Sequence, residues 1–216
     1  EAEAAEVRAL GGRAHILTVP NLVDVDAYPN LADDTPESDA LLFLGSFGYA
    51  PNANAAEMLL TRVFPAIRRR RPAARLLLVG RGLPARLQAM ARRDGAVETP
   101  GFVDDVKPWY RRAAVVVLPV TEGAGMLFKT VEALACGKAA VGVPHAFRGL
   151  DVHGAHPFTT ASGWRDLAGE TVRLLGDAGA RRALAARART FAESRLSWEY
   201  GDRCLAESLV LEGACR

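Results

Sequence analysis

Short runs of consecutive apolar residues recur along the chain from residue 41 onward, and most are closed by Gly or Pro. The clearest are Leu41–Leu44, Leu76–Val79, Val115–Leu118 and Ala139–Val143, with a weaker one near Val97. A strand covered on both faces has no polar side, so continuous apolar runs of this length are typical of buried parallel strands. The pattern predicts a parallel sheet built from these runs.

Segments with apolar residues three and four positions apart lie between the predicted strands, as expected for amphipathic helices. The first runs through Met58 and Ile67, with Asn52 or Asn54 as its N-cap. The other predicted helices lie at 86–92, from Asp104 or Asp105 through Tyr110, from Met126 to Gly137, and at 164–175, 180–194 and 198–211. Strands that alternate with helices predict an α/β fold, a Rossmann-like parallel sheet with helices on both faces.

The first 39 residues follow a different pattern. Residues 1–11 are helix-like, His15–Val19 forms a short apolar run typical of a strand, and Asp24–Asp39 is rich in Pro, Asp and Asn, as exposed connections are. A helix, a strand and a long polar connector make poor use of the start of a self-contained domain. We therefore expect the chain to be the later part of a larger protein.

Open parallel sheets bind ligands in the crevice beyond the carboxyl ends of their strands. The segments that follow the predicted strands are Gly45–Phe47, Gly80–Gly82, Gly101–Val103 and Glu122–Gly125. These segments are therefore expected to lie along one rim of the sheet.

The stretch from Pro119 to Pro144 combines a strand end, a glycine-bearing loop, a helix and a second strand. The first turn of a helix has N–H groups without intrahelical partners, so this order is suited to binding a phosphate. Lys129 and Glu132 are three positions apart on the predicted helix, which places a cation and a carboxylate on neighbouring positions of one face. The loop and helix are a candidate anion site.

Composition adds limits to this picture. The 216-residue chain is 50% hydrophobic, which is enough for a sizeable core, and its net charge is +2 with 24% charged residues. Lys and Arg are spread among Asp and Glu, which does not indicate nucleic-acid binding. The densest basic run, Arg68–Arg71 before Pro72, is better explained as a helix end than as a membrane or nucleic-acid patch.

The remaining polar chemistry argues against a metal or disulfide scaffold. The cysteines, Cys136, Cys204 and Cys215, are odd in number and lack ligand spacing. His145, His153 and His156 have no carboxylate partners at ligand spacing, and we expect no metal. No apolar run approaches the ~18 residues of a membrane span, and a reducing, cytoplasmic location fits best.

Several stretches, in this order, resemble the C-terminal domain of a retaining glycosyltransferase of family 4 (group 1), which has the two-domain GT-B architecture. They are Val19-Pro20-Asn21, LFLGSFGYAPNANA from Leu42, LLLVGRG from Leu76, GFVDDV from Gly101, Glu122–Gly125, KTVEALACGKAAVG from Lys129, and Leu196-Ser197-Trp198. Each is common alone, but the ordered set spans nearly the whole chain and is specific.

The resemblance implies a domain organisation. Residues 1–23 would be the end of a missing N-terminal acceptor domain with the interdomain linker, and residues 24–216 the donor-binding domain. The last helix, at about residues 197–212, would cross back to the acceptor domain. The family's ligands would be a nucleotide diphosphate sugar and an unknown acceptor, without a cofactor, and the missing domain leaves peripheral membrane association open.

Two glutamates match the family's paired-glutamate motif. Glu132 matches the second, which binds the ribose hydroxyls of the donor; a carboxylate can accept two hydrogen bonds from a diol. The alternative is a surface helix glutamate. Glu122 matches the first, as a candidate catalytic residue. The family spacing is eight positions and the spacing here is ten, so the contact of Glu122 with the sugar stays open.

The same resemblance suggests residues for the diphosphate. Lys129 lies where some members place a basic residue, and a lysine near a helix N-terminus can stabilise a departing diphosphate. Arg81 is a second candidate, or a plain turn arginine. The arginine and lysine pair that many members carry after the first strand of the domain is not evident at Ser46–Ala50, which strengthens the case for Lys129 and Arg81.

Other candidate donor contacts involve the backbone. Gly45 and Ser46 would let the main chain approach the phosphates or the sugar, and the loop residues Gly123, Gly125 and Met126 would do the same.

Phe102 and Val103 lie where family members hold the nucleobase, with a role as core residues equally compatible with the sequence.

The expected function is transfer of a hexose-type sugar from a nucleotide diphosphate sugar with retention of configuration. A non-catalytic nucleotide-binding or regulatory module of the same fold is the alternative. A GT-B epimerase or phosphorylase fits less well, because an epimerase would need a more charged cleft and a phosphorylase a longer chain with a lysine for pyridoxal phosphate.

Overall fold

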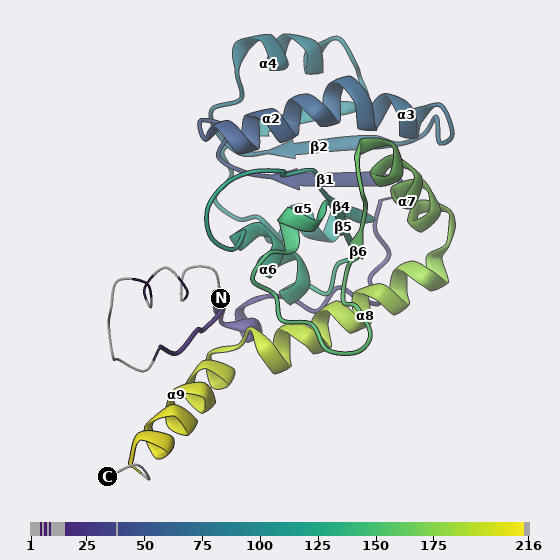
Figure 1. The fold of residues 1–216 in the computed structure, drawn as a ribbon. Coiled ribbons are helices and arrows are strands. Elements are labelled where there is room, and N and C mark those ends of the chain that lie inside the picture. Colours follow the sequence, from purple (N-terminus) through teal and green to yellow (C-terminus); the bar gives the residue numbers. More distant parts are fainter. Residues whose placement is uncertain (1–4, 6, 8, 10–15, 38, 214–216) are drawn as a thin grey trace.

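A computed structural model describes residues 5, 7, 9, 16–37 and 39–213 (Figure 1). Within this part of the chain a parallel sheet forms the centre, in the order β3-β2-β1-β4-β5-β6. The strands are β1 Ala40–Leu44, β2 Arg75–Val79, β3 Val97–Gly101, β4 Val115–Leu118, β5 Ala140–Gly142 and β6 Thr159–Thr160. The parallel α/β sheet predicted from the apolar runs is confirmed.

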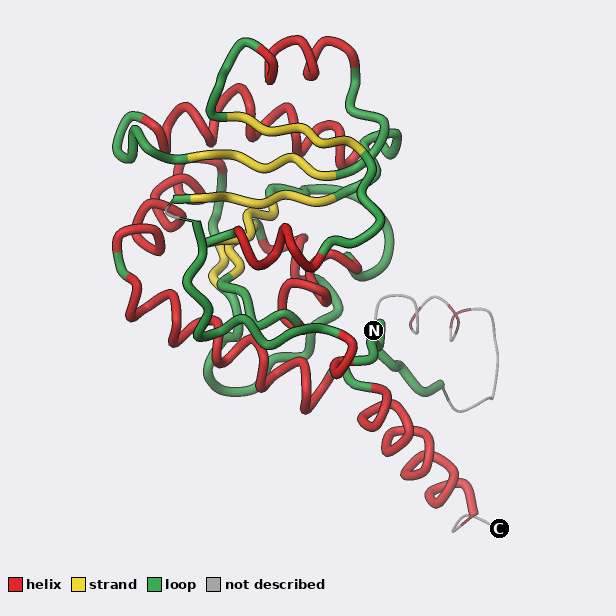
Figure 2. The backbone as a smooth tube through the Cα atoms, turned by 180° about the vertical axis from the view of Figure 1, so that it is seen from behind, coloured by secondary structure: helices red, strands yellow, loops and turns green. Residues whose placement is uncertain are grey.

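Helices cover both faces of this sheet (Figures 1 and 2). They are α2 Ala50–Met58, a π-helical turn Leu59–Val63, α3 Phe64–Arg68, α4 Ala85–Arg92, α5 Lys107–Arg112, α6 Phe128–Ala135, α7 Trp164–Gly176, α8 Ala178–Arg195 and α9 Trp198–Gly213, with 3-10 turns at Val25–Ala27 and Pro144–Phe147. Helices α2 to α4 and α7 pack on one side, and α5, α6 and α8 on the other. Coverage of both faces explains why the strands are apolar at successive positions.

The core lies on the central strands. Leu41, Leu42 and Phe43 of β1 have no exposed surface, and Leu42 pairs in register with Leu77 of β2 and Val116 of β4. The β1 strand is therefore fixed from both sides, and the segment that follows it starts from a rigid position.

The strand order reverses direction at one place. The chain proceeds from β1 outward through β2 to β3, and then returns to the other side of β1 to form β4, β5 and β6. In doubly wound sheets the ligand crevice lies at the carboxyl ends of the strands flanking this reversal. The fold therefore predicts that a ligand would bind beside the loops that follow β1 and β4.

Two predicted helix starts can be compared with the structure. The Asp105 carboxylate accepts a hydrogen bond of 2.9 Å from the Lys107 N–H at the start of α5, as predicted. Asn52 and Asn54 do not cap α2, which begins at Ala50 with Pro51 in its first turn. Pro is favoured in the first turn because its position needs no N–H donor, so Pro51 sets the helix start before either asparagine.

The N-terminal prediction fares differently. Ile16–Val19 is not a strand, and residues 1–11 and His15 lie largely outside the described residues. A strand forms only where its backbone can hydrogen-bond to a neighbouring strand. The backbone pairing in this region is made further along, at Val23, which forms a single parallel bridge with Ser197 and donates its N–H to the Leu196 carbonyl oxygen at 2.8 Å.

Helix α9 projects away from the sheet (Figures 1 and 2). Its start lies against the N-terminal segment, since a Cβ on Gly201 would come within 2.3 Å of the Leu22 side chain. Trp198 is 60% exposed. Among the described helices none combines the length and apolar character needed to cross a membrane.

The Arg68–Arg71 run closes α3, as predicted for a helix end. Arg68 binds Asp94 at 2.8 Å, and Arg71 binds the buried carboxylate of Asp39 at 2.7 Å. These two arginines therefore tie the helix end to neighbouring parts of the domain.

Candidate functional site

The loops after β1 and β2 touch through their glycines. Gly80 has φ +139°, and a Cβ at this position would lie 1.8 Å from the Gly45 carbonyl oxygen. Only glycine tolerates both the conformation and the contact. Gly45 itself faces Asn52 and Lys129, since a Cβ there would lie 2.9 Å from Asn52 Cγ and 3.2 Å from Lys129 Nζ. The glycines let two polar side chains approach the backbone at the crevice.

Lys129 in the first turn of α6 is held by neutral groups. Its ammonium donates a hydrogen bond to Asn52 Oδ1 and lies 4.7 Å from the centre of the Phe43 ring. Asn52 in turn donates from Nδ2 to the Ser46 carbonyl oxygen at 2.9 Å. Burial lowers the pKa of Lys129 to about 8, with the nearby charge of Glu132 opposing the shift. No ion pair engages Lys129 among the described residues, so its charge is available to an anion.

Glu132 lies one turn further along α6 and is half-buried. Tyr28 Oη donates to Glu132 Oε1 at 3.1 Å. Burial raises the pKa of Glu132, and the hydrogen bond from Tyr28 opposes that shift. Tyr110 is fully buried and donates to the Lys129 carbonyl oxygen at 3.2 Å, which fixes the first turn of α6. Lys129 and Glu132 therefore lie one turn apart on the same helix, as their spacing predicted.

Glu122 lies elsewhere on the loop after β4. Its carboxylate is exposed and accepts a hydrogen bond of 2.6 Å from Asn54 Nδ2 on α2. The next residue, Gly123, lies against Tyr49, where an added Cβ would be 3.0 Å from Tyr49 Oη. The structure therefore joins this half of the loop to the start of α2, and the sugar contact of Glu122 stays a prediction.

The other predicted residues lie at the same edge with different surroundings. Arg81 is exposed, and its carbonyl oxygen accepts from the Phe47 N–H at 2.8 Å, so its backbone shapes the turn after β1. Phe102 is 67% exposed, whereas Val103 is half-buried against the core. A role as a core residue is therefore excluded for Phe102, whereas Val103 packs partly against the core.

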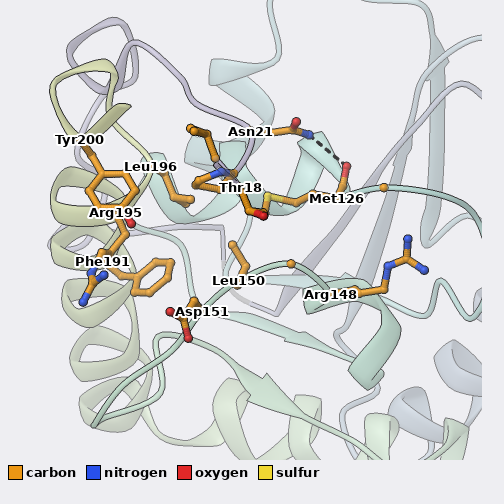
Figure 3. Close-up of a pocket in the computed structure, with 14 residues that line it drawn as sticks. Thr18, Asn21, Met126, Arg148, Leu150, Asp151, Phe191, Arg195, Leu196 and Tyr200 are labelled. Carbon is orange, nitrogen blue, oxygen red and sulfur yellow. Dashed lines mark hydrogen bonds between the residues drawn. The ribbon is translucent and has the colours of Figure 1, made fainter. Parts of the chain in front are cut away.

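A cavity of about 610 Å³ opens beside the loop that follows β4 (Figure 3). It contains Gly125 and Met126 from the loop, and Asn21 Nδ2 donates to the Met126 carbonyl oxygen at 3.2 Å. Phe191 and Tyr200 line the opposite side (Figure 3). The full lining is Thr18, Val19, Pro20, Asn21, Gly125, Met126, Arg148, Gly149, Leu150, Asp151, Phe191, Arg195, Leu196 and Tyr200.

This cavity does not include Lys129, Glu132 or Glu122. The cavity borders the loop residues Gly125 and Met126, which precede Lys129 in the chain, and the anion site at Lys129 stays a prediction. In the described residues no group of three or more His, Cys, Asp or Glu side chains could hold a metal ion.

Sequence reasoning missed three residues of the site. Asn52 was expected at a helix cap, Tyr28 lay in a segment expected to be an exposed connection, and Tyr110 was predicted only as part of a helix. The available signal was Pro51, because a proline in the first turn places Asn52 inside the helix, where a polar side chain needs a partner.

Replacing Asn52 by alanine is expected to lower the free energy of unfolding by about 1–3 kcal/mol, because the Ser46 carbonyl and the Lys129 ammonium each lose a partner in a partly buried place. Urea unfolding measures the change. Asn54→Ala is the matched control, since Asn54 is exposed and makes one hydrogen bond at the surface. Equal losses in the two variants would contradict the buried role of Asn52.

The fold and the site define a class: a doubly wound α/β domain with a cation and a carboxylate at the switch point, as in nucleotide-binding domains. Comparison with known families gives the family itself. The model of the glycosyl transferases group 1 family matches residues 38–177, and the chain belongs to this family.

Individual relatives agree with this assignment. The chain is 34% identical over 142 residues to the phosphatidyl-myo-inositol mannosyltransferase of Mycobacterium tuberculosis, a match that covers 63% of this chain and 36% of that protein. The chain thus spans about a third of the length of this curated relative.

Solved structures share the fold. The Anabaena protein HepE in complex with UDP and glucose superposes with a TM-score of 0.71 at 20% identity, covering 93% of this chain and 58% of HepE. Sucrose-phosphate synthase from Thermosynechococcus elongatus gives a TM-score of 0.71 at 20% identity, with 98% and 56% covered. At 20% identity, these two likenesses show that the fold is shared.

Proposed function

We propose that this chain is the donor-binding domain of a retaining hexosyltransferase that uses a nucleotide diphosphate sugar. The observation that carries the proposal is the first half of α6, where Lys129 is bound by a neutral amide and Glu132 lies one turn away at the sheet's switch point. The mannosyltransferase relative and the UDP complex of HepE support the substrate class.

Each residue has a defined task in this proposal. The Lys129 ammonium binds the diphosphate and stabilises the negative charge that develops as it departs. Glu132, oriented by Tyr28, accepts hydrogen bonds from the ribose hydroxyls. Glu122 would face the sugar once donor and acceptor are bound. The transfer needs no metal or cofactor in this scheme, because a lysine and backbone N–H groups supply the positive charge.

The domain organisation is part of the same proposal. Residues 1–23 belong to the linker and the acceptor domain of a longer protein, residues 24–216 form the donor domain, and α9 packs on the acceptor domain. The exposed Trp198 at the start of α9 supports this last point. The proposed location is the cytoplasm, and peripheral association with a membrane is compatible with this organisation.

Calorimetric titration of the chain with UDP, GDP and ADP tests the proposal. We expect one of the three to bind with micromolar affinity and the corresponding nucleoside to bind far more weakly, because the Lys129 contact is to phosphate. No binding of any diphosphate at millimolar concentration would refute the donor site. A nucleotide-binding module without transfer would bind equally well, but the full-length protein would then release no sugar from any donor.

A further inference from the structure

A second cavity lies at the end of the strands opposite to the donor loops. Its lining includes Ala114 just before β4, Gly137 to Ala139 just before β5, and Ala178 at the start of α8. These positions are at the amino ends of the strands, whereas the donor loops follow the carboxyl ends. The volume is about 220 Å³, smaller than the roughly 300–1,000 Å³ of sites for drug-sized ligands.

Lys138 lines this cavity and is only 3% exposed. Among the described residues three charged side chains are buried, and two of them have ionic partners: Asp39 binds Arg71 at 2.7 Å, and Arg189 binds Glu193 at 2.6 Å. Lys138 has neither an ion pair nor a side-chain hydrogen bond in the described part of the chain. A largely buried lysine whose charge has no protein partner is costly, so a counter-charge that enters the cavity would stabilise it.

Other positive groups surround the same cavity. Arg181 and Arg182 on the first two turns of α8 line it, and Arg181 uses Nη1 to bind the Leu174 carbonyl oxygen at 2.8 Å. Helix α8 begins at Ala178 on the cavity wall, and the Asp177 carboxylate caps it by accepting from the Ala180 N–H at 2.8 Å, so the positive charge at this wall comes from the arginines.

Two carboxylates also belong to the lining, Asp33 and Asp34. Asp34 is already engaged, because its Oδ2 accepts from Arg111 Nε at 3.0 Å. Neither carboxylate lies within ion-pair distance of Lys138, although the charge of Asp34 reaches it. The lining therefore keeps an excess of positive charge, with Lys138 as its buried centre.

We propose that this cavity is a second anion site, which binds the phosphate or carboxylate group of a small molecule through Lys138 and Arg182. The two chemistries are alike in charge and in hydrogen-bond acceptance, and the volume limits the ligand to a small metabolite. The site is separate from the donor crevice, since it lies at the amino ends of β4 and β5, whereas the donor loops follow the carboxyl ends of the strands.

The lysine content of the chain makes the proposal measurable. The sequence has three lysines, Lys107, Lys129 and Lys138. Lysine labelled with ¹³C at Cε therefore gives three resolvable signals in the intact chain, which are assigned by single Lys→Met variants. We expect inorganic phosphate to move the Lys138 signal with saturation in the millimolar range or below, and to leave the Lys107 signal in place.

Citrate and UDP complete the experiment. Movement of the Lys138 signal by citrate alone would identify a carboxylate ligand, and movement by phosphate alone a phosphoryl ligand; both support the site. UDP is expected to move Lys129, so a failed donor site and a failed second site give different signals. Arg182→Ala should weaken the anion affinity by about threefold, the size of one partly exposed charge contact. A Lys138 signal that neither phosphate nor citrate moves at millimolar concentration would overturn the proposal.

Discussion

Replacing Glu132 by alanine is expected to weaken nucleoside diphosphate binding at least about tenfold, with a much smaller effect on stability. Hydrogen bonds to charged groups contribute about 1.5–3 kcal/mol, and a tenfold change corresponds to about 1.4 kcal/mol. Burial raises the pKa of Glu132, so the ionised carboxylate opposes folding near neutral pH. Removing the carboxylate loses its hydrogen bond with Tyr28 but also removes this unfavourable charge. The variant should therefore lose affinity for the diphosphate while its free energy of unfolding changes little.

Calorimetry and urea unfolding measure the two effects on the same protein. Glu132→Gln keeps the shape and an acceptor for Tyr28, and is expected to fall between the wild-type protein and the alanine variant in affinity. Glu170→Ala is the matched control, because Glu170 pairs with Arg173 on α7, away from the crevice. If Glu132→Ala binds as the control does, Glu132 is a helix surface residue and the ribose role is wrong.

Replacing Lys129 by methionine is expected to weaken binding of the diphosphate at least about tenfold while leaving the weak binding of the nucleoside unchanged. The lysine contact is to phosphate, and a charge-assisted hydrogen bond has about the required magnitude. Methionine fills a similar volume beside Phe43, which limits the effect on packing. Lys107→Met is the control. Equal losses for diphosphate and nucleoside would indicate damage to the fold.

The same lysine gives the affinity a pH dependence. Burial lowers the pKa of Lys129 to about 8, so the free protein loses this positive charge as the pH rises through 8, and diphosphate affinity is expected to fall there. The lowered pKa also means that the unfolded state binds the proton more tightly between pH 8 and about 10.4. The stability penalty of this ammonium is therefore fully present below pH 8 and is relieved as the pH rises. Lys129→Met should lose the affinity trend, and its stability should rise less steeply with pH than that of the wild-type protein; part of the rise remains because burial also lowers the pKa of Lys138 to about 8.

The sequence by itself determined the sheet, most of the helices and the positions of Lys129 and Glu132 on one helix. Apolar runs such as Leu41–Leu44 appear as buried strands because both faces are covered, and that requirement is local and periodic. Gly137 ends the helical segment of α6 in a left-handed conformation with φ +59°, as a glycine after a helix commonly does. Lys129 and Glu132 followed from helix spacing alone.

Only the tertiary structure decided which partners these residues have. Tyr28 and Glu132 are 104 positions apart, and Asn52 and Lys129 are 77 apart, so no periodicity connects them. The same holds for Lys138, whose burial without a counter-charge depends on how α8 packs beside the start of β5. The pattern of apolar and polar residues shows whether a segment will be buried on one face or on both. Which residue it contacts there depends on how segments far apart in the chain pack together.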